Sequence, residues 1–129
     1  MPDTITTIGA YAFSRCDGIV GALRLGSGVV TIGERAFFNS KNITSVTIPA
    51  SVKYIGACAF VCRAGTEGLL NKSNLKYVKF EIAEGWYAYP SSNPGSGATG
   101  LLIDSAGLAD TTLASEAVSM TYGDSYLMR

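Results

Sequence analysis

The feature that most constrains the fold of this chain is a motif that occurs three times in its first half. The copies read TTIGAYAFSRC, VTIGERAFFNS and KYIGACAFVCR, at residues 6–16, 30–40 and 53–63. An Ile, a Gly, an Ala and a Phe recur at the same places, and the copies are 24 and 23 residues apart. Such a period is typical of repeat proteins, in which each copy is one structural unit and successive copies stack on each other.

Each motif is followed by a segment that favours β-structure, namely IVGALRL, NITSVTI and NLKYVKF at residues 19–25, 42–48 and 74–80. Residues 43–48 are rich in Val, Ile and Thr and end in an alternation of apolar and polar residues, as expected of a half-buried strand. A single strand of this kind cannot bury its apolar face, so we expect a parallel β-ladder of about three repeats, with Leu23, Val46 and Val78 aligned. The third repeat carries an insertion of about nine residues near 63–72.

The motif IGxxAFxxC, followed by NITSVTIP and SVxxIG, resembles the BspA-type leucine-rich repeat. The resemblance covers roughly residues 2–80, and it is strongest over residues 43–60. The Cys of the family motif is present as Cys16, replaced by Ser40 and displaced to Cys62 in the third copy. The resemblance implies an α/β leucine-rich-repeat solenoid. It also implies a surface protein of a host-associated microbe that adheres to host or microbial ligands.

The chain divides into three repeats at residues 1–80 and a C-terminal capping region at residues 81–129. The formal charge is +5 in the first part and −5 in the second, so the tail could dock on the repeats. The last strand would otherwise expose an apolar end and an unpaired edge. We therefore expect the tail to fold back, with Trp86 or Tyr87 near Phe80. Composition predicts a flexible loop at 90–100, a short strand at 101–104 and a short helix at 109–120.

Catalytic motifs are missing from the sequence. The chain has no histidine, which removes the commonest general base and metal ligand. It also lacks the phosphate-binding loop, the dinucleotide-binding glycine motif and HExxH. We expect no enzyme activity, no cofactor and no metal site. The odd number of cysteines, Cys16, Cys58 and Cys62, favours buried thiols over a disulfide framework. A disulfide or redox-active pair between Cys58 and Cys62 is the alternative.

The candidate ligand-binding residues lie between the core positions of the three strands. They form two columns, one of Arg24, Thr47 and Lys79 and one that includes Ser45 and Tyr77. The resemblance implies that this strand face binds the ligand; the alternative is an ordinary solvated face. Trp86 and Tyr87 could stack on a sugar ring or a protein partner, or could seal the end of the core.

Three functions are compatible with these features. The leading hypothesis is a non-enzymatic binding or adhesion module of a microbial surface protein, with a protein or glycan ligand. The second is a structural spacer or terminal stalk segment that contacts adjacent repeats of a longer chain. The third is an intracellular interaction protein of a mobile element. We expect a cell-surface or secreted location if the chain is a fragment, and a cytoplasmic one if Met1 is the native start. Nucleic acid binding and membrane insertion are not expected, since there is no dense basic patch and no long apolar run.

Overall fold

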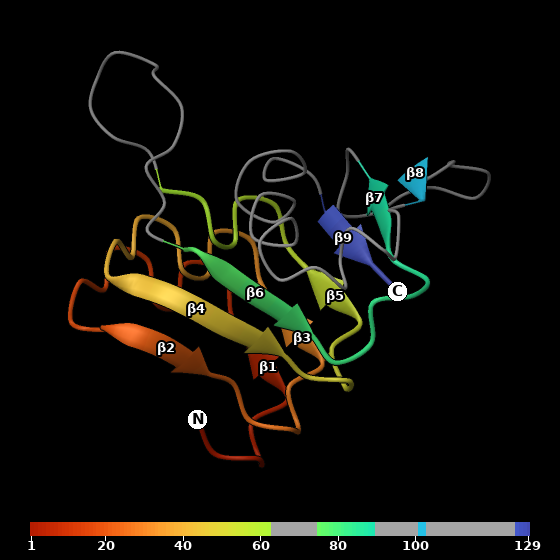
Figure 1. Ribbon diagram of the computed structural model, residues 1–129, viewed down its shortest axis with the longest axis horizontal. Coiled ribbons are helices and arrows are strands. Elements are labelled where there is room, and N and C mark those ends of the chain that lie inside the picture. The colour runs from red at the N-terminus through yellow and green to blue at the C-terminus, as the bar shows by residue number, and fades with distance from the viewer. Residues whose placement is uncertain (63–74, 90–100, 103–125) are drawn as a thin grey trace.

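A computed structural model describes residues 1–62, 75–89, 101–102 and 126–129 of the chain, with residues 101–102 described by their backbone alone (Figure 1). Each repeat contributes two strands, one to each of two parallel ladders. The strands of the first ladder are β2 (Gly21–Arg24), β4 (Ile43–Ile48) and β6 (Tyr77–Phe80). Those of the second ladder are β1 (Thr7–Ile8), β3 (Thr31–Ile32) and β5 (Tyr54–Ile55).

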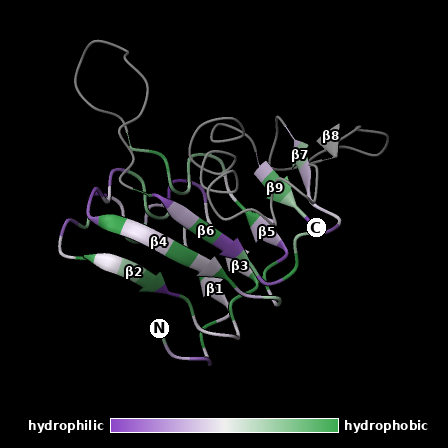
Figure 2. Cartoon of the chain, viewed as in Figure 1, coloured by the Kyte–Doolittle hydropathy of each residue, from purple (hydrophilic) through white to green (hydrophobic). Residues whose placement is uncertain are grey.

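The register of the first ladder confirms the predicted alignment of the repeats. Leu23 of β2 lies opposite Val46 of β4, which in turn lies opposite Val78 of β6. Along β6 and the last three residues of β4, buried and exposed residues alternate, and the hydropathy of the strands follows this pattern (Figure 2), so one face of the ladder is buried and the other faces outward. The second ladder was not predicted, because strands of two residues are too short to show any alternation in sequence.

The core contains apolar side chains from both ladders and a column of three phenylalanines. Phe37 lies between Phe13 and Phe60, with ring centroids 5.3 Å apart on each side and the ring planes nearly parallel. Phe37 and Phe60 are buried, and Phe13 packs against the same cluster from the open end. Equivalent residues of successive repeats therefore stack directly on each other, as the sequence predicted.

The motif between the two strands of a repeat forms turns, and the described residues contain no helix. The N–H groups of Tyr11 and Phe13 donate to carbonyls of the next repeat, whereas those of Ala12 and Ser14 donate to carbonyls three residues earlier. Because alternate N–H groups point to the neighbouring repeat, this segment cannot continue as an α-helix, in which every N–H bonds within its own segment. The repeat fold is present, but the helical part of the expected α/β class has no counterpart in these residues.

The segments after the third repeat join the second ladder. Strand β9 (Tyr126–Met128) pairs antiparallel with β5, and β7 (Tyr87–Tyr89) pairs with both β9 and β8 (Leu101–Leu102). Trp86 is buried and meets Phe80 edge to face, with centroids 5.3 Å apart. The expected contact near Phe80 is thus confirmed. The described strands of the tail pair with β5, however, and leave the outer edge of β6 without a strand partner among the described residues.

Several predictions of local structure lie wholly or partly outside the described residues. Those wholly outside are the insertion near 63–72, the loop at 90–100 and the helix at 109–120. Of the strand expected at 101–104, residues 101–102 form β8.

Candidate functional site

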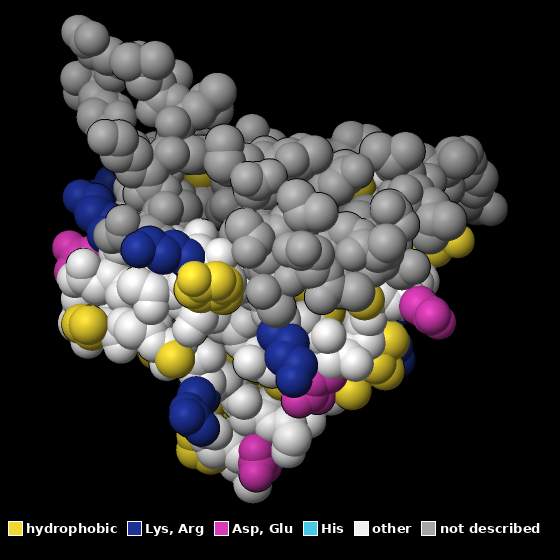
Figure 3. Space-filling model, viewed as in Figure 1, with side chains coloured by type: hydrophobic (Ala, Val, Ile, Leu, Met, Phe, Trp, Pro, Cys, Tyr) yellow, Lys and Arg dark blue, Asp and Glu magenta, His cyan; other side chains and the backbone are white. Residues whose placement is uncertain are grey.

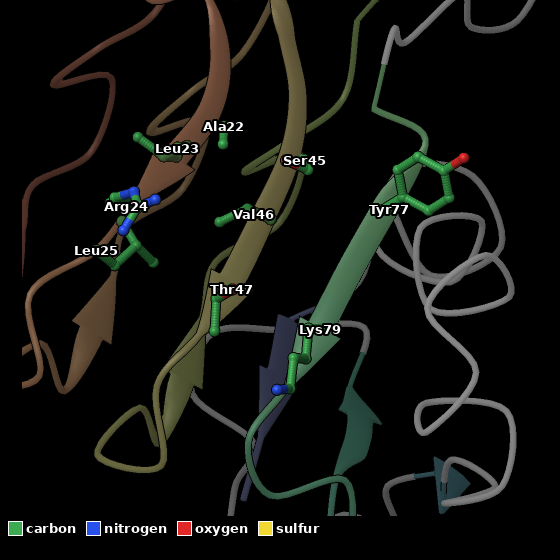
Figure 4. A pocket seen from close by; sticks show the side chains of 9 residues that line it. All are labelled: Ala22, Leu23, Arg24, Leu25, Ser45, Val46, Thr47, Tyr77 and Lys79. Carbon is green, nitrogen blue, oxygen red and sulfur yellow. The ribbon is translucent and has the colours of Figure 1, made fainter.

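The two predicted columns of outward-facing residues come together on the first ladder. Arg24, Thr47 and Lys79 occupy one row of the register, and Ser45 pairs with Tyr77 in another. All five line an open groove of about 520 Å³ across β2, β4 and β6 (Figure 4). Ladder pairing therefore places on one surface five side chains that are spread over more than fifty residues of sequence.

The side chains of the groove are held by the strands beneath them. Val46 and Val78 point inward and are buried, which fixes the strand faces and leaves Thr47 and Lys79 exposed. Tyr77 is 56% exposed, so its ring is available to a ligand. Adjacent strands lie about 4.8 Å apart, so the Cα atoms of Arg24 and Lys79 are roughly 10 Å apart, with Thr47 between them.

The groove carries positive charge without a balancing carboxylate among its lining residues. Figure 3 shows Lys and Arg side chains at several places on the face that contains β2, β4 and β6. Within the described part of the chain, neither Arg24 nor Lys79 has an ion-pair partner. This arrangement can bind an anionic group, because the two cations gain a partner that the described residues of the chain do not supply.

Several carboxylates of the described residues are engaged away from the groove. The Asp3 carboxylate accepts a hydrogen bond from the Ser27 N–H at 2.8 Å. This bond, together with the Ser27 hydroxyl, holds the pKa of Asp3 below its usual range. The Glu81 carboxylate accepts the N–H of Ala50.

A second polar cluster lies in the turns that follow β1 and β3, and it involves Arg35. Its guanidinium donates to the Tyr11 hydroxyl at 2.8 Å and pairs with Glu34. The hydrogen bond to Tyr11 raises the pKa of Arg35. Because this cation already has partners within the protein, it is a weaker candidate for ligand binding than Arg24 or Lys79.

The structure does not support Trp86 as a ligand contact and separates Tyr87 from the groove. Trp86 is only 1% exposed, and its indole N–H donates to the Ile82 carbonyl at 3.0 Å. A ligand could not reach this ring without displacing core residues, so the alternative interpretation, that Trp86 seals the core, is the one that fits. Tyr87 is 38% exposed but belongs to the second sheet, on β7.

Sequence reasoning did not include Leu25 among the site residues, although Leu25 lines the groove. It lies just beyond the end of β2 and is half-buried. The sequence offered little reason to place Leu25 at the site, because it aligns with Ile48 and Phe80 of the later repeats and was therefore expected to lie in the hydrophobic core. Its position at the outer strand of the ladder exposes part of it to the groove.

Metal ligands do not gather in the described residues, where no group of three His, Cys, Asp or Glu side chains could hold an ion. Cys58 and Cys62 are buried, and Cys16 is half-buried. In the same described ranges, no helix has the length and apolar character required to cross a membrane.

Stacked copies of about 23 residues, with a parallel strand ladder and an outward-facing groove, define a leucine-rich-repeat protein. Residues 1–83 match the family model described as "BspA type Leucine rich repeat region (6 copies)". The match covers more than half of the chain, which therefore belongs to the BspA-type leucine-rich-repeat family. Neither the curated proteins nor the solved structures include a match to the chain.

Proposed function

We propose that this chain is a non-enzymatic binding module of a microbial surface protein, in which the two ladders form a short solenoid and the groove on β2, β4 and β6 receives the ligand. The observation that carries the proposal is the convergence of Arg24, Ser45, Thr47, Tyr77 and Lys79 on this groove. Charged, hydroxyl and aromatic groups on a rigid scaffold suit recognition of a polar partner. Membership of the BspA-type family supports an adhesive role at a cell surface.

The test is an array of defined glycans and host-matrix proteins, probed with the full chain and with two matched variants. Thr47→Tyr places a bulky side chain at the centre of the groove, where Thr47 is exposed. Thr7→Tyr makes the same change at an exposed position of β1, on the other ladder. We expect at least one probe to bind wild type and Thr7→Tyr equally and to lose binding to Thr47→Tyr. The proposal fails if no probe binds, or if Thr47→Tyr binds every probe as strongly as wild type does.

A structural role is the second candidate, and one observation favours it. Strands β1 and β2 each have a ladder partner on one side only among the described residues. Further repeats of the same kind would fit against these edges and continue both ladders. A stalk of this kind would show no binding that depends on Thr47.

A further inference from the structure

The groove combines features that together select one class of ligand. Two cations stand at the two ends of one row, two hydroxyl side chains lie on the middle strand, and one exposed tyrosine lies on β6. Ser45 and Thr47 supply donors and acceptors, whereas Arg24 and Lys79 supply charged donors alone. A complementary ligand therefore carries many hydroxyl groups and at least two separated acidic groups.

We propose that the groove binds an acidic glycan, a chain of sugars that bears carboxylate or sulfate groups. This inference rests on the proposed function and names its ligand class. The acidic groups pair with Arg24 and Lys79, whose Cα atoms lie roughly 10 Å apart on opposite sides of the middle strand. Two cations placed on separate strands suit acidic groups spaced along a chain of sugars better than a single ion. The sugar hydroxyls bond to Ser45 and Thr47, and the ring of Tyr77 covers the apolar face of a sugar.

The paired backbone of the groove floor favours a glycan over an acidic peptide. Strand β4 is bonded to β2 on one side and to β6 on the other, so its main-chain groups are already used. An extended peptide gains its affinity from main-chain bonds to an open sheet edge. Among the described strands of this ladder, the open edges are the outer sides of β2 and β6, at the margins of the groove, whereas the middle strand beneath Ser45 and Thr47 offers none. Side-chain groups are what the groove presents, and glycans are recognised through such groups.

The number of cations argues against nucleic acid. Proteins that bind DNA or RNA through the backbone commonly neutralise about six to ten phosphates. The groove contains two cations, and the whole chain has a formal net charge of zero. Two charges held among hydroxyl groups fit a ligand of lower charge density than a nucleic acid.

The experiment measures binding of the full chain to keratan sulfate, which is sulfated and has no uronic acid, to polygalacturonate, which is only carboxylated, and to dextran, which is neutral. Arg24→Gln/Lys79→Gln removes both groove cations. Arg15→Gln/Lys53→Gln is the control, since it removes the same charge from exposed residues outside the groove. We expect one or both acidic glycans to bind and dextran not to. The groove variant should weaken binding about tenfold or more, whereas the control changes it little.

A second pair of variants measures the contribution of the Tyr77 ring to binding, independently of the two cations. Tyr77→Phe retains the ring and should bind as wild type does, whereas Tyr77→Ala should bind several-fold more weakly. Which acidic glycan binds distinguishes sulfate from carboxylate recognition, and both outcomes support the proposal. Equal binding of dextran, stronger binding of polyglutamate or of an oligonucleotide, or no effect of the groove variant would overturn it.

Failure of this inference is distinguishable from failure of the proposed function. If a protein or a neutral glycan binds and Thr47→Tyr abolishes that binding, the groove is a binding site but its ligand is not an acidic glycan. If no probe shows dependence on Thr47, both proposals fail together.

Discussion

At the scale of single residues, the repeated glycines show what stacking demands of the sequence. A Cβ atom on Gly33 would lie 2.5 Å from the backbone nitrogen of Ala10, and one on Gly56 would overlap the backbone of Glu34. Gly9 occupies the same place in the first copy, yet nothing lies within 4 Å of such an atom. The glycine is therefore required where a repeat packs on the one before it, and not by the turn itself.

We predict that Gly33→Ala destabilises the protein and that Gly9→Ala does not. Overpacking against a neighbouring backbone costs about 1 to 3 kcal/mol. At Gly9 the methyl group meets open space, and the loss of chain freedom in the unfolded state adds up to about 1 kcal/mol of stability. Chemical denaturation of the two variants measures the difference in free energy of unfolding. Equal destabilisation by both changes would contradict the stacking explanation.

Ser40 shows how a substitution within the motif is accommodated. It stands where the first copy has Cys16, and it is buried. Its hydroxyl donates to the Phe13 carbonyl at 2.6 Å and accepts the Cys16 N–H at 3.2 Å. A buried hydroxyl is stable when it is hydrogen-bonded in this way, so the serine links two repeats through its polar group.

At the scale of elements, the turn segments join successive repeats by hydrogen bonds, as the strands also do. Tyr11, Arg35 and Cys58 occupy the same place in successive copies, and each has a positive φ, between 52° and 59°. The N–H groups of Tyr11 and Arg35 donate to carbonyls of the following repeat. These inter-repeat bonds hold a backbone conformation that residues other than glycine seldom adopt. The three phenylalanines of the column belong to these same turns.

We predict that Phe37→Ala lowers the free energy of unfolding by about 3 to 5 kcal/mol, the usual cost of removing a large buried aromatic side chain. Phe37 is 1% exposed and contacts a ring on each side. Phe38→Ala is the matched control, because the neighbouring ring is only half-buried and lies outside the column. Thermal melts of both variants provide the comparison. A melting temperature for Phe37→Ala close to that of Phe38→Ala would show that the column is not central to stability.

At the scale of the whole molecule, the C-terminal strand returns to the third repeat and occupies the free edge of β5. Strand β9 pairs with Tyr54 and Ile55, and Leu127 is buried against the core. The Tyr126 hydroxyl donates to Glu34 at 3.0 Å, so the tail also reaches the second repeat. An unpaired edge strand invites association with other chains, and β9 removes that edge.

The packing of Tyr54 against Tyr126 of the tail predicts a loss of stability at alkaline pH. Burial, followed by the nearby Tyr126 and Glu34, raises the pKa of Tyr54. Ionisation is then more costly in the folded than in the unfolded state, so stability falls as pH rises from the ordinary tyrosine pKa of 10.0 to the higher folded value. Unfolding experiments between pH 8 and 11 (roughly the window of tyrosine ionisation) should show a smaller loss for Tyr54→Phe. Tyr77→Phe, at an exposed site, should follow wild type. Identical curves for wild type and Tyr54→Phe would refute the prediction.

The sequence by itself determined the repeat, the register of the first ladder and the column of phenylalanines. These features depend on identical residues at a constant spacing, and stacking equal units brings equal positions together. For the same reason, the spacing of the repeats is sufficient to place Arg24, Thr47 and Lys79 in one row.

Tertiary structure alone decided the second ladder, the turns that replace the expected helix, and the burial of Trp86. Strands of two residues have no period that can be recognised in sequence, and positive φ at Tyr11 or Arg35 is imposed by hydrogen bonds to another repeat. The chemistry of Trp86 suits both ligand binding and sealing of the core. In the structure, the chain turns after β6 and packs the Trp86 ring against Phe80, which buries it. Whether a tryptophan is buried or exposed depends on the path of the chain, which the residue type alone does not determine.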